Sequence, residues 1–194
     1  MSTTVTVTNG MEEDYLYSPD ILNELNFDHC LATYKPPISH RYPGEDLLMR
    51  PLCLSDYDRG FIQLLSQLTK VGDVTKGEFE DQFCHMKSCS DTYFITVIED
   101  TSSGQVIGAG SLVVEQKFIH HCSARGRVED IVVNNQYRGK QLGKLLVDVL
   151  TLLSKKVGCY KTSLECNDSM VQFYSQLGFV KEEGQNYMCQ RFKD

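Results

Sequence analysis

The chain has 194 residues, 41% of them hydrophobic, and its 26 acidic residues outnumber 19 basic ones to give a net charge of −7. These values are typical of one globular domain with a short extension, and they exclude a disordered or fibrous chain. The acidic balance also excludes general nucleic-acid binding, which needs many Lys and Arg side chains against phosphates, but it allows a local positive site for a small anion.

The start of the chain lacks the basic and then apolar order of a secretory signal, and no apolar run is long enough to cross a bilayer. We therefore expect a cytoplasmic protein without membrane insertion; peripheral association with endomembranes through partners stays open. In that reducing compartment the eight cysteines are expected to be free thiols. His120-His121-Cys122 and Cys84-His85 are weak metal candidates, because neighbours on a strand point to opposite faces, and we expect no metal.

Residues 1–45 differ in composition from the rest of the chain. They carry Pro36-Pro37, Pro43-Gly44 and polar stretches, with one short amphipathic piece at Ile21–Phe27. This composition predicts an N-terminal extension that docks loosely or is partly disordered. Residues 46–194 are then expected to form the single folded domain.

The domain alternates between strand-like and helix-like segments. Ser55-Asp56 is expected to cap a helix with an apolar stripe that reaches Leu68, and Thr75 begins a second helix. A long helix from about Leu142 ends at Gly158, and a shorter one spans Ser169–Leu177. The expected strands are Asp46–Leu52, Tyr93–Glu99, Gln105–Glu115, Arg127–Val133, Tyr160–Cys166, Phe179–Lys181 and Tyr187–Phe192. Hairpins followed by a β-α-β unit predict an α/β (α+β mixed) domain with a mixed sheet and helices on both faces.

The most informative stretch runs from the strand Arg127–Val133 into Arg138-Gly139-Lys140-Gln141-Leu142-Gly143-Lys144. It is a strand, a short loop and a helix that opens with glycines and basic residues. Unpaired N–H groups at a helix N-terminus hold phosphate oxygens, and the glycines allow close approach. A pyrophosphate is the natural ligand. A nucleotide hydrolase or a dinucleotide fold is disfavoured, because neither G-x-x-x-x-G-K-[ST] nor G-x-G-x-x-G is present.

This loop resembles the coenzyme A loop of the GCN5-related N-acetyltransferase (GNAT) superfamily, whose pattern is Q/R-x-x-G-x-G/A. Arg138 and Gly143 fit its ends, and Gln141 stands where the middle glycine is usual. Further segments, in order, are similar to the eukaryotic glucosamine 6-phosphate N-acetyltransferase family from about Leu47 onward. They are Lys117-Phe118-Ile119-His120, Arg127–Val133, Gly158-Cys159-Tyr160-Lys161, Phe173-Tyr174, Gly178-Phe179 and Met188 with Arg191.

The resemblance implies a GNAT-type domain whose mostly antiparallel sheet is splayed in the middle. It implies acetyl-CoA as co-substrate and direct attack by the amine of D-glucosamine 6-phosphate, in the pathway to UDP-N-acetylglucosamine. A homodimer with C-terminal strands near the interface is also implied. No covalent acetyl-enzyme is expected.

The resemblance also assigns residues. The expected acetyl-CoA contacts are Glu129, Asp130, Ile131, Val132, Val133, Arg138, Gly139, Lys140, Gln141, Leu142, Gly143, Lys144, Glu165 and Tyr174. The expected phosphosugar contacts are Thr69, Lys117, Phe118, Ile119, His120, Glu129, Asp130, Tyr160, Lys161 and Arg191. Arg191 serves either its own subunit or the partner subunit.

The catalytic candidates are Glu129, Asp130, Glu165 and Tyr174. Alternation along a strand predicts that Glu129 and Asp130 face opposite ways, so that only one approaches the amine. Glu165, Glu129, or backbone carbonyls with water take the ammonium proton. Tyr174 either protonates the leaving thiolate or donates a hydrogen bond to it, because a phenol with a pKa of about 10 is a weaker acid than a thiol of about 8.5.

Two other functions stay open on the sequence. The first is acetyl transfer to another amine, such as a protein terminus or a polyamine. The second is a non-catalytic acyl-coenzyme A-binding protein, which the presence of all four catalytic candidates disfavours.

Overall fold

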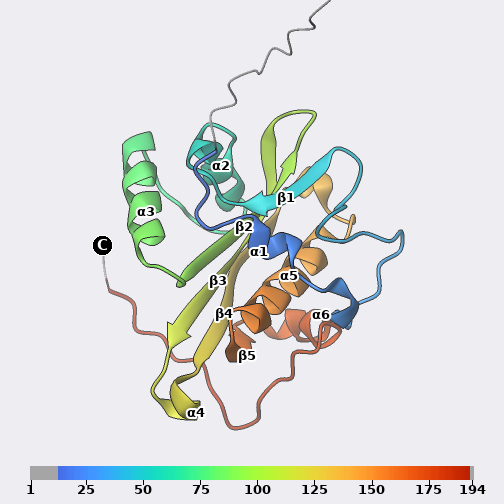
Figure 1. Ribbon diagram of the computed structural model, residues 1–194, viewed down its shortest axis with the longest axis vertical. Coiled ribbons are helices and arrows are strands. Elements are labelled where there is room, and N and C mark those ends of the chain that lie inside the picture. The colour runs from blue at the N-terminus through green and yellow to red at the C-terminus, as the bar shows by residue number, and fades with distance from the viewer. Residues whose placement is uncertain (1–12, 193–194) are drawn as a thin grey trace, which may run out of the picture.

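A five-stranded sheet in the order β1-β2-β3-β4-β5 forms the centre of the computed structural model, which describes residues 13–192 (Figure 1). The neighbouring strands are antiparallel except for β4 and β5, which run parallel. The sheet is therefore mixed and mostly antiparallel, as the sequence predicts. The strands are β1 Leu47–Pro51, β2 Tyr93–Asp100, β3 Gln105–Gln116, β4 Ala124–Val133 and β5 Cys159–Leu164.

Helices cover both faces of this sheet, with α5 on one face and α2 and α3 on the other (Figure 1). The side chains of β2 alternate between the two faces of the sheet. Phe94 and Ile98 pack with α5, whereas Ile95 and Val97 pack with α2 and α3. The helices are α1 Asp20–Asn23, α2 Phe61–Leu65, α3 Lys76–Ser88, α4 Ile119–Cys122, α5 Leu142–Lys156 and α6 Val171–Ser175. No described helix combines the length and apolar character needed to span a membrane.

The helix expected from Ser55 to Leu68 is wrong as one element. A 3-10 turn at Leu54–Tyr57 and the separate helix α2 replace it. Gly60 breaks the run because its φ is +82°, and a Cβ there would lie 2.9 Å from Gln105 Oε1. The second helix begins as expected, with the Thr75 side chain accepting from the Glu78 amide.

Two expected strands, Phe179–Lys181 and Tyr187–Phe192, are absent from the part of the chain that the structure describes. A strand needs a partner edge, and in this single chain the segment pairs with none of the described strands. Its apolar side chains are exposed instead, including Val180, Met188 and Phe192 at 83%, 89% and 83%.

Parts of the described N-terminal segment reach the core. Leu16, Leu22 and Leu25 are buried, and Tyr17 Oη lies 2.7 Å from Thr96 Oγ1 of β2. Other side chains of this segment, such as Leu31 and Tyr42, are exposed at 73% and 58%. Residues 1–12, part of the segment expected to be partly disordered, lie outside the described residues, and a domain boundary near residue 45 stays a prediction.

Candidate functional site

A bulge interrupts β4 in the segment that the sequence analysis singled out. The β3–β4 register shifts between Ala109 and Ser111, and Asp130 has a φ of +54°. Val128 packs on the α5 side, whereas Val132 packs on the α2 and α3 side, although regular alternation would put both on one face. The expected alternation of Glu129 and Asp130 is therefore interrupted at the bulge.

Gly110 of β3 makes room for this bulge. A Cβ at Gly110 would lie 2.5 Å from the Ile131 side chain and 2.9 Å from that of Leu150 on α5. The Ile131 side chain therefore occupies the space that any larger residue at position 110 would need. The shape of β4 consequently depends on a glycine in the neighbouring strand.

Strand β5 separates from β4 beside the same stretch, and the space between residues 129–133 of β4 and Glu165 after β5 is here called the cleft. The parallel pairing with β5 runs from Ala124 to Val128, where Val128 is opposite Leu164, and stops there. Residues 129–133 of β4 keep their partner β3 but have no strand on the β5 side among the described residues. The splayed sheet is thus confirmed, and the backbone of β4 faces the opening with unpaired polar groups.

Arg127 joins the two walls of this cleft. Its Nε donates to Glu129 Oε1 at 2.9 Å, and a terminal nitrogen donates to Glu165 Oε1 at 2.8 Å. One guanidinium therefore holds a carboxylate of β4 next to a carboxylate that follows β5. Sequence reasoning gave Arg127 no role, although its spacing of two residues from Glu129 on one strand indicates a shared face.

Asp130 has a different environment. Burial of its carboxyl group raises the pKa of Asp130 above the usual value, and the nearby Glu129 charge raises it further. No side-chain hydrogen bond to Asp130 occurs among residues 13–192. Of the two adjacent carboxylates, only Glu129 is paired with Arg127.

Tyr174 lies on α6, with its ring centroid 5.0 Å from Phe173 and 6.1 Å from Phe179. Burial raises the pKa of the Tyr174 phenol, and the neighbouring Cys166 thiol adds to the shift. Within the described chain the Tyr174 hydroxyl has no hydrogen-bond partner, so it is free to donate to a ligand.

The loop before α5 has the features of a phosphate site. Gly139 and Gln141 have φ values of +82° and +64°, and α5 begins at Leu142 with no side chain capping its first turn. The N–H groups of that turn are available to an anion. A Cβ at Gly143 would have only Val133 Cγ2, at 3.8 Å, as a near neighbour. The loop therefore fits the pyrophosphate of a coenzyme, with Arg138 and Lys140 exposed beside it.

The third basic residue of this motif is engaged elsewhere. Lys144 Nζ donates to the Thr33 carbonyl oxygen at 2.5 Å and lies 4.7 Å from the centroid of the Tyr34 ring. Its position gives Lys144 a role in holding the N-terminal segment. The expected contact between Lys144 and a pyrophosphate has no test in this structure and stays a prediction.

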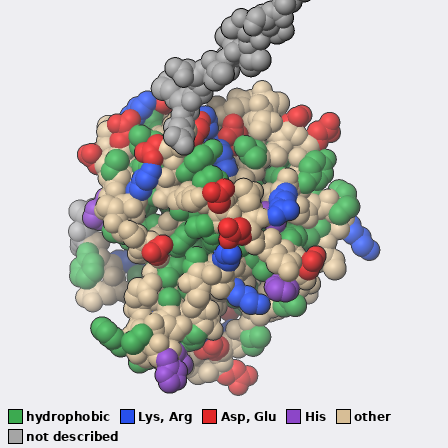
Figure 2. Space-filling view, viewed as in Figure 1, with side chains coloured by type: hydrophobic (Ala, Val, Ile, Leu, Met, Phe, Trp, Pro, Cys, Tyr) green, Lys and Arg blue, Asp and Glu red, His purple; other side chains and the backbone are tan. Residues whose placement is uncertain are grey.

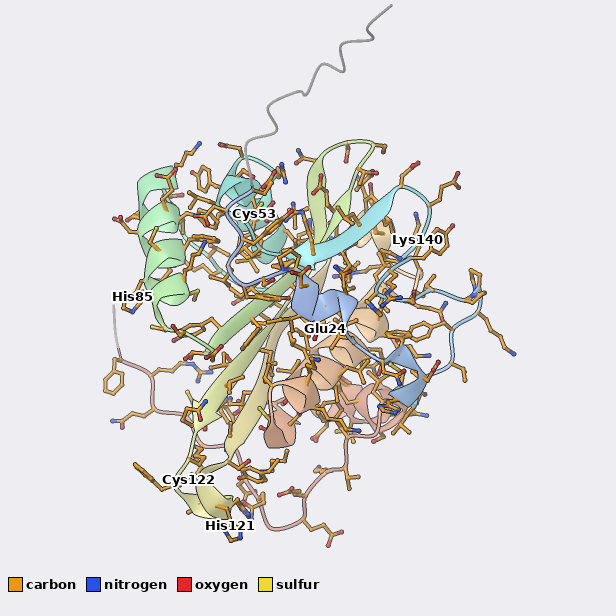
Figure 3. The ribbon with its side chains drawn as sticks, in the orientation of Figure 1. Glu24, Cys53, His85, His121, Cys122 and Lys140 are labelled. Carbon is orange, nitrogen blue, oxygen red and sulfur yellow. The ribbon has the colours of Figure 1, made fainter. Side chains whose placement is uncertain are left out.

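The expected acceptor residues gather at the opposite end of β4, around α4. The His120 ring stacks on Tyr160 at 4.1 Å, and the register places Lys161 opposite Arg125. His120 and His121 have left-handed φ values of +51° and +60°, so α4 is a tight turn. Figure 3 shows His121 and Cys122 at this end of the molecule and Lys140 near the other.

The remaining acceptor candidates are dispersed in one chain. Phe118 is 96% exposed and Ile119 61%, and Lys117 pairs with Glu115 at 2.5 Å. Thr69 follows α2, and Arg191 lies in the exposed C-terminal segment. At about 3.3 Å per residue, Ala124 beside this turn lies roughly 16 Å along β4 from Glu129. The chain alone therefore brings together the cleft residues but not the whole acceptor set.

Metal coordination has little support at these positions. Over residues 13–192, no group of three or more His, Cys, Asp and Glu side chains is arranged to hold a metal ion. All eight cysteines are free thiols.

The chain is similar to known proteins in both sequence and structure. Residues 60–179 match the model of the acetyltransferase (GNAT) family. A Drosophila melanogaster relative, named "Probable glucosamine 6-phosphate N-acetyltransferase", is 53% identical over 185 residues, which cover 94% of this chain and 84% of the relative. A glucosamine 6-phosphate N-acetyltransferase from Arabidopsis thaliana is 42% identical, covering 70% of this chain and 91% of the relative. The crystal structure of the glucosamine-6-phosphate N-acetyltransferase from Arabidopsis thaliana has a TM-score of 0.73 at 40% identity, covering 77% of this chain and 100% of that one.

Replacing Gly110 by Ala should destabilise the protein, because the new methyl group meets Ile131 and Leu150 at 2.5 and 2.9 Å. We expect the free energy of unfolding in urea to fall by about 1–3 kcal/mol, as for overpacked cores. Gly77→Ala is the matched control, since a Cβ at this position in α3 has open space around it. It should raise the free energy of unfolding by roughly 0.5–1 kcal/mol. Equal stability of Gly110→Ala and the unchanged protein would contradict the steric argument.

Proposed function

The chain belongs to the acetyltransferase (GNAT) family, and we propose that it transfers the acetyl group of acetyl-CoA to the amine of D-glucosamine 6-phosphate. The products are N-acetyl-D-glucosamine 6-phosphate and CoA, on the route to UDP-N-acetylglucosamine. The observation that carries the proposal is the edge of β4 that β5 leaves unpaired, with the carboxylates of Glu129 and Glu165 joined across it by Arg127 and an uncapped helix N-terminus following β4. The named relatives support the choice of acceptor.

The cleft suits an extended thioester co-substrate. The pyrophosphate would bind the N–H groups of Leu142, Gly143 and Lys144, with charge added by Arg138 and Lys140. The pantetheine arm would run along the unpaired edge of β4, where it supplies the hydrogen-bond partners that β5 does not. Acetyl-CoA brings the activated acetyl group, and the chain positions it.

The amine must lose a proton before it attacks. Glu129 and Glu165 are both held by Arg127, so they orient the amine as fixed hydrogen-bond acceptors. Asp130 has a pKa raised above its usual value and no cationic partner among the described residues, so its carboxylate is free of an ion pair and can accept the proton. We assign the proton to Asp130, directly or through one water molecule.

The leaving thiolate needs a donor, and Tyr174 fits. Because burial raises the pKa of its phenol, complete transfer of its proton to the thiolate becomes less favourable than for an ordinary tyrosine. A hydrogen bond from Tyr174 to the developing thiolate remains favourable. Tyr174 therefore acts as a hydrogen-bond donor in the proposed mechanism.

A second copy of the chain would complete the acceptor site. The His120 and Lys161 end of β4 is too distant from Glu129 to serve one sugar phosphate in the same subunit. Exposed apolar side chains surround that end, with Phe118 at 96%, and Figure 2 shows hydrophobic and histidine side chains at the end where Figure 1 places α4. We propose a homodimer in which α4 and the C-terminal segment pair with the partner. The free thiols support a reducing, cytoplasmic location.

Thiol release from acetyl-CoA, measured with a panel of amines, tests the acceptor. Glucosamine 6-phosphate should be turned over strongly, whereas unphosphorylated glucosamine, spermidine and a peptide N-terminus should not, because the acceptor site carries cations for a phosphate. Comparable turnover of any other amine would replace the proposed acceptor. Tight binding of CoA with no turnover of any amine would favour a non-catalytic binding protein.

Tyr174→Phe tests the donor at the leaving group. Loss of the hydrogen bond should lower kcat by about 10²-fold, the usual effect of removing one donor to a developing anion, with little change in either KM. Tyr93→Phe, at a half-buried tyrosine of β2 on the α2 side, is the matched control and should retain full activity. A kcat for Tyr174→Phe equal to that of the control would assign Tyr174 to packing alone.

Phe118→Glu tests the dimer. Light scattering after gel filtration should give twice the chain mass for the unchanged protein and one chain mass for the variant, which should lose turnover but still bind CoA. Leu48→Glu, at a 46% exposed leucine of the β1 edge, should stay dimeric. A monomeric and fully active unchanged protein would overturn the proposed assembly.

A further inference from the structure

Gln141 is the residue that departs from the Q/R-x-x-G-x-G/A pattern of the coenzyme A loop. Its φ of +64° lies in the left-handed region that a glycine adopts without cost and a side chain does not. The structure shows what the extra side chain contacts. Gln141 Nε2 donates to the Lys35 carbonyl oxygen at 2.9 Å, and the Lys35 amide donates to Gln141 Oε1 at 3.4 Å.

Two further contacts continue this attachment along α5. Lys144 Nζ donates to the Thr33 carbonyl oxygen, and Tyr34 Oη donates to Asp148 Oδ2 at 2.6 Å. Gln141, Lys144 and Asp148 are three and four positions apart, which is the spacing of one helix face. They bind three consecutive residues of the N-terminal segment, Thr33–Lys35, here called the strap.

The strap also has contacts within the N-terminal segment. The Tyr34 ring lies 5.9 Å from Phe27, and Phe27 lies 5.4 Å from His40, so the segment carries its own aromatic cluster. On the other side, Gln141 is the residue directly before the first turn of α5, whose N–H groups form the proposed pyrophosphate site. A shift of the Gln141 side chain would therefore also shift the backbone N–H groups that would hold the phosphates.

We infer that Gln141 is a positioning residue for acetyl-CoA, and that the strap is part of the coenzyme site although it contributes no phosphate contact of its own. The two hydrogen bonds to Lys35 offset the left-handed conformation of Gln141 and hold the first turn of α5 in the orientation that receives the pyrophosphate. A glycine at position 141 would remove the cost of the left-handed backbone, but it would also remove the two hydrogen bonds between the loop and the strap. This inference rests on the proposed use of acetyl-CoA, and not on the identity of the acceptor.

The Gln141→Gly variant distinguishes two roles for this residue, a substitute for the usual glycine and a positioning residue. If Gln141 only substitutes for the usual glycine, the variant should bind CoA as well as the unchanged protein or better. If Gln141 positions the loop, CoA should bind about three- to tenfold more weakly by calorimetry, the effect expected for losing one or two hydrogen bonds. The KM for acetyl-CoA should rise by the same factor, with kcat and the acceptor KM unchanged. Gln141→Asn, which tolerates the left-handed backbone but is one methylene shorter, should behave like the glycine variant.

Glu24→Gln is the matched control. Glu24 lies on the α1 side of the same N-terminal segment and pairs with Lys156 at the far end of α5, 2.6 Å away (Figure 3). Its removal loosens the segment from α5 without touching the loop, so the affinity for CoA should be unchanged. A loss of affinity equal to that of Gln141→Gly would assign the effect to general docking of the segment and overturn the inference.

Hydrogen exchange provides a readout that a purely structural role would not change. Because coupling between two sites is reciprocal, CoA should slow exchange of the Lys35 amide in the unchanged protein and not in Gln141→Gly. Equal protection in both proteins would overturn the inference. Failure of the unchanged protein to bind CoA would instead remove the proposed function, whereas CoA binding without turnover of glucosamine 6-phosphate would remove only the acceptor and leave this test intact.

Discussion

The unpaired length of β4 beyond Val128 is the constraint on which both ends of the candidate site depend. Strand β5 leaves β4 at this point, and the bulge at Asp130 changes which face the following side chains occupy. The same divergence exposes backbone polar groups that an extended ligand can pair. It also brings Glu129 and Glu165 to opposite walls of one opening, where Arg127 joins them. Gly110 permits this arrangement from the neighbouring strand.

Helix α5 connects the cleft to the N-terminal segment. Most of its surface is apolar and buried between the sheet and the chain that precedes β1. Its polar contacts at Gln141, Lys144 and Asp148 are used by the strap, so the proposed anion site at its first turn would rely on backbone N–H groups and on Arg138 and Lys140. Helix α5 is thus held by the sheet and by the N-terminal segment, and its first turn is the end that would meet a ligand.

Much of the fold follows from sequence pattern. The long helix that ends near Gly158, the helix that begins after Thr75 and the strand at Tyr93–Glu99 depend on local signals, and the structure confirms them. The break at Gly60 was missed because the left-handed backbone of this glycine, with φ +82°, interrupts an apolar stripe that continues past it in the sequence. The absent C-terminal strands were overpredicted because alternation reports a tendency to pair and says nothing of where the partner edge is.

Some features of the candidate site were likewise predictable from the sequence, and others were not. The loop and helix start at residues 138–144 were predictable, since their glycines and basic residues are contiguous in the sequence, and their use as a phosphate site stays a prediction. The bulge was not, because its register depends on Gly110 and Ile131 in two strands. Nor was the engagement of Lys144, whose partners Thr33 and Tyr34 lie in a segment that composition alone assigns to a loose extension.

The contact between Tyr34 and Asp148 spans 114 positions, which has a consequence for the chain during its synthesis. At about 5–20 residues per second, the ribosome needs roughly 6–23 s to produce the second partner after the first. Leu22 and Leu25, which also pack with α5, wait for a similar time with their apolar side chains uncovered. Leu22, Leu25 and Tyr34 are therefore among the first of these residues to leave the ribosome and the last to reach their contacts with α5, and their apolar side chains are open to aggregation over that interval.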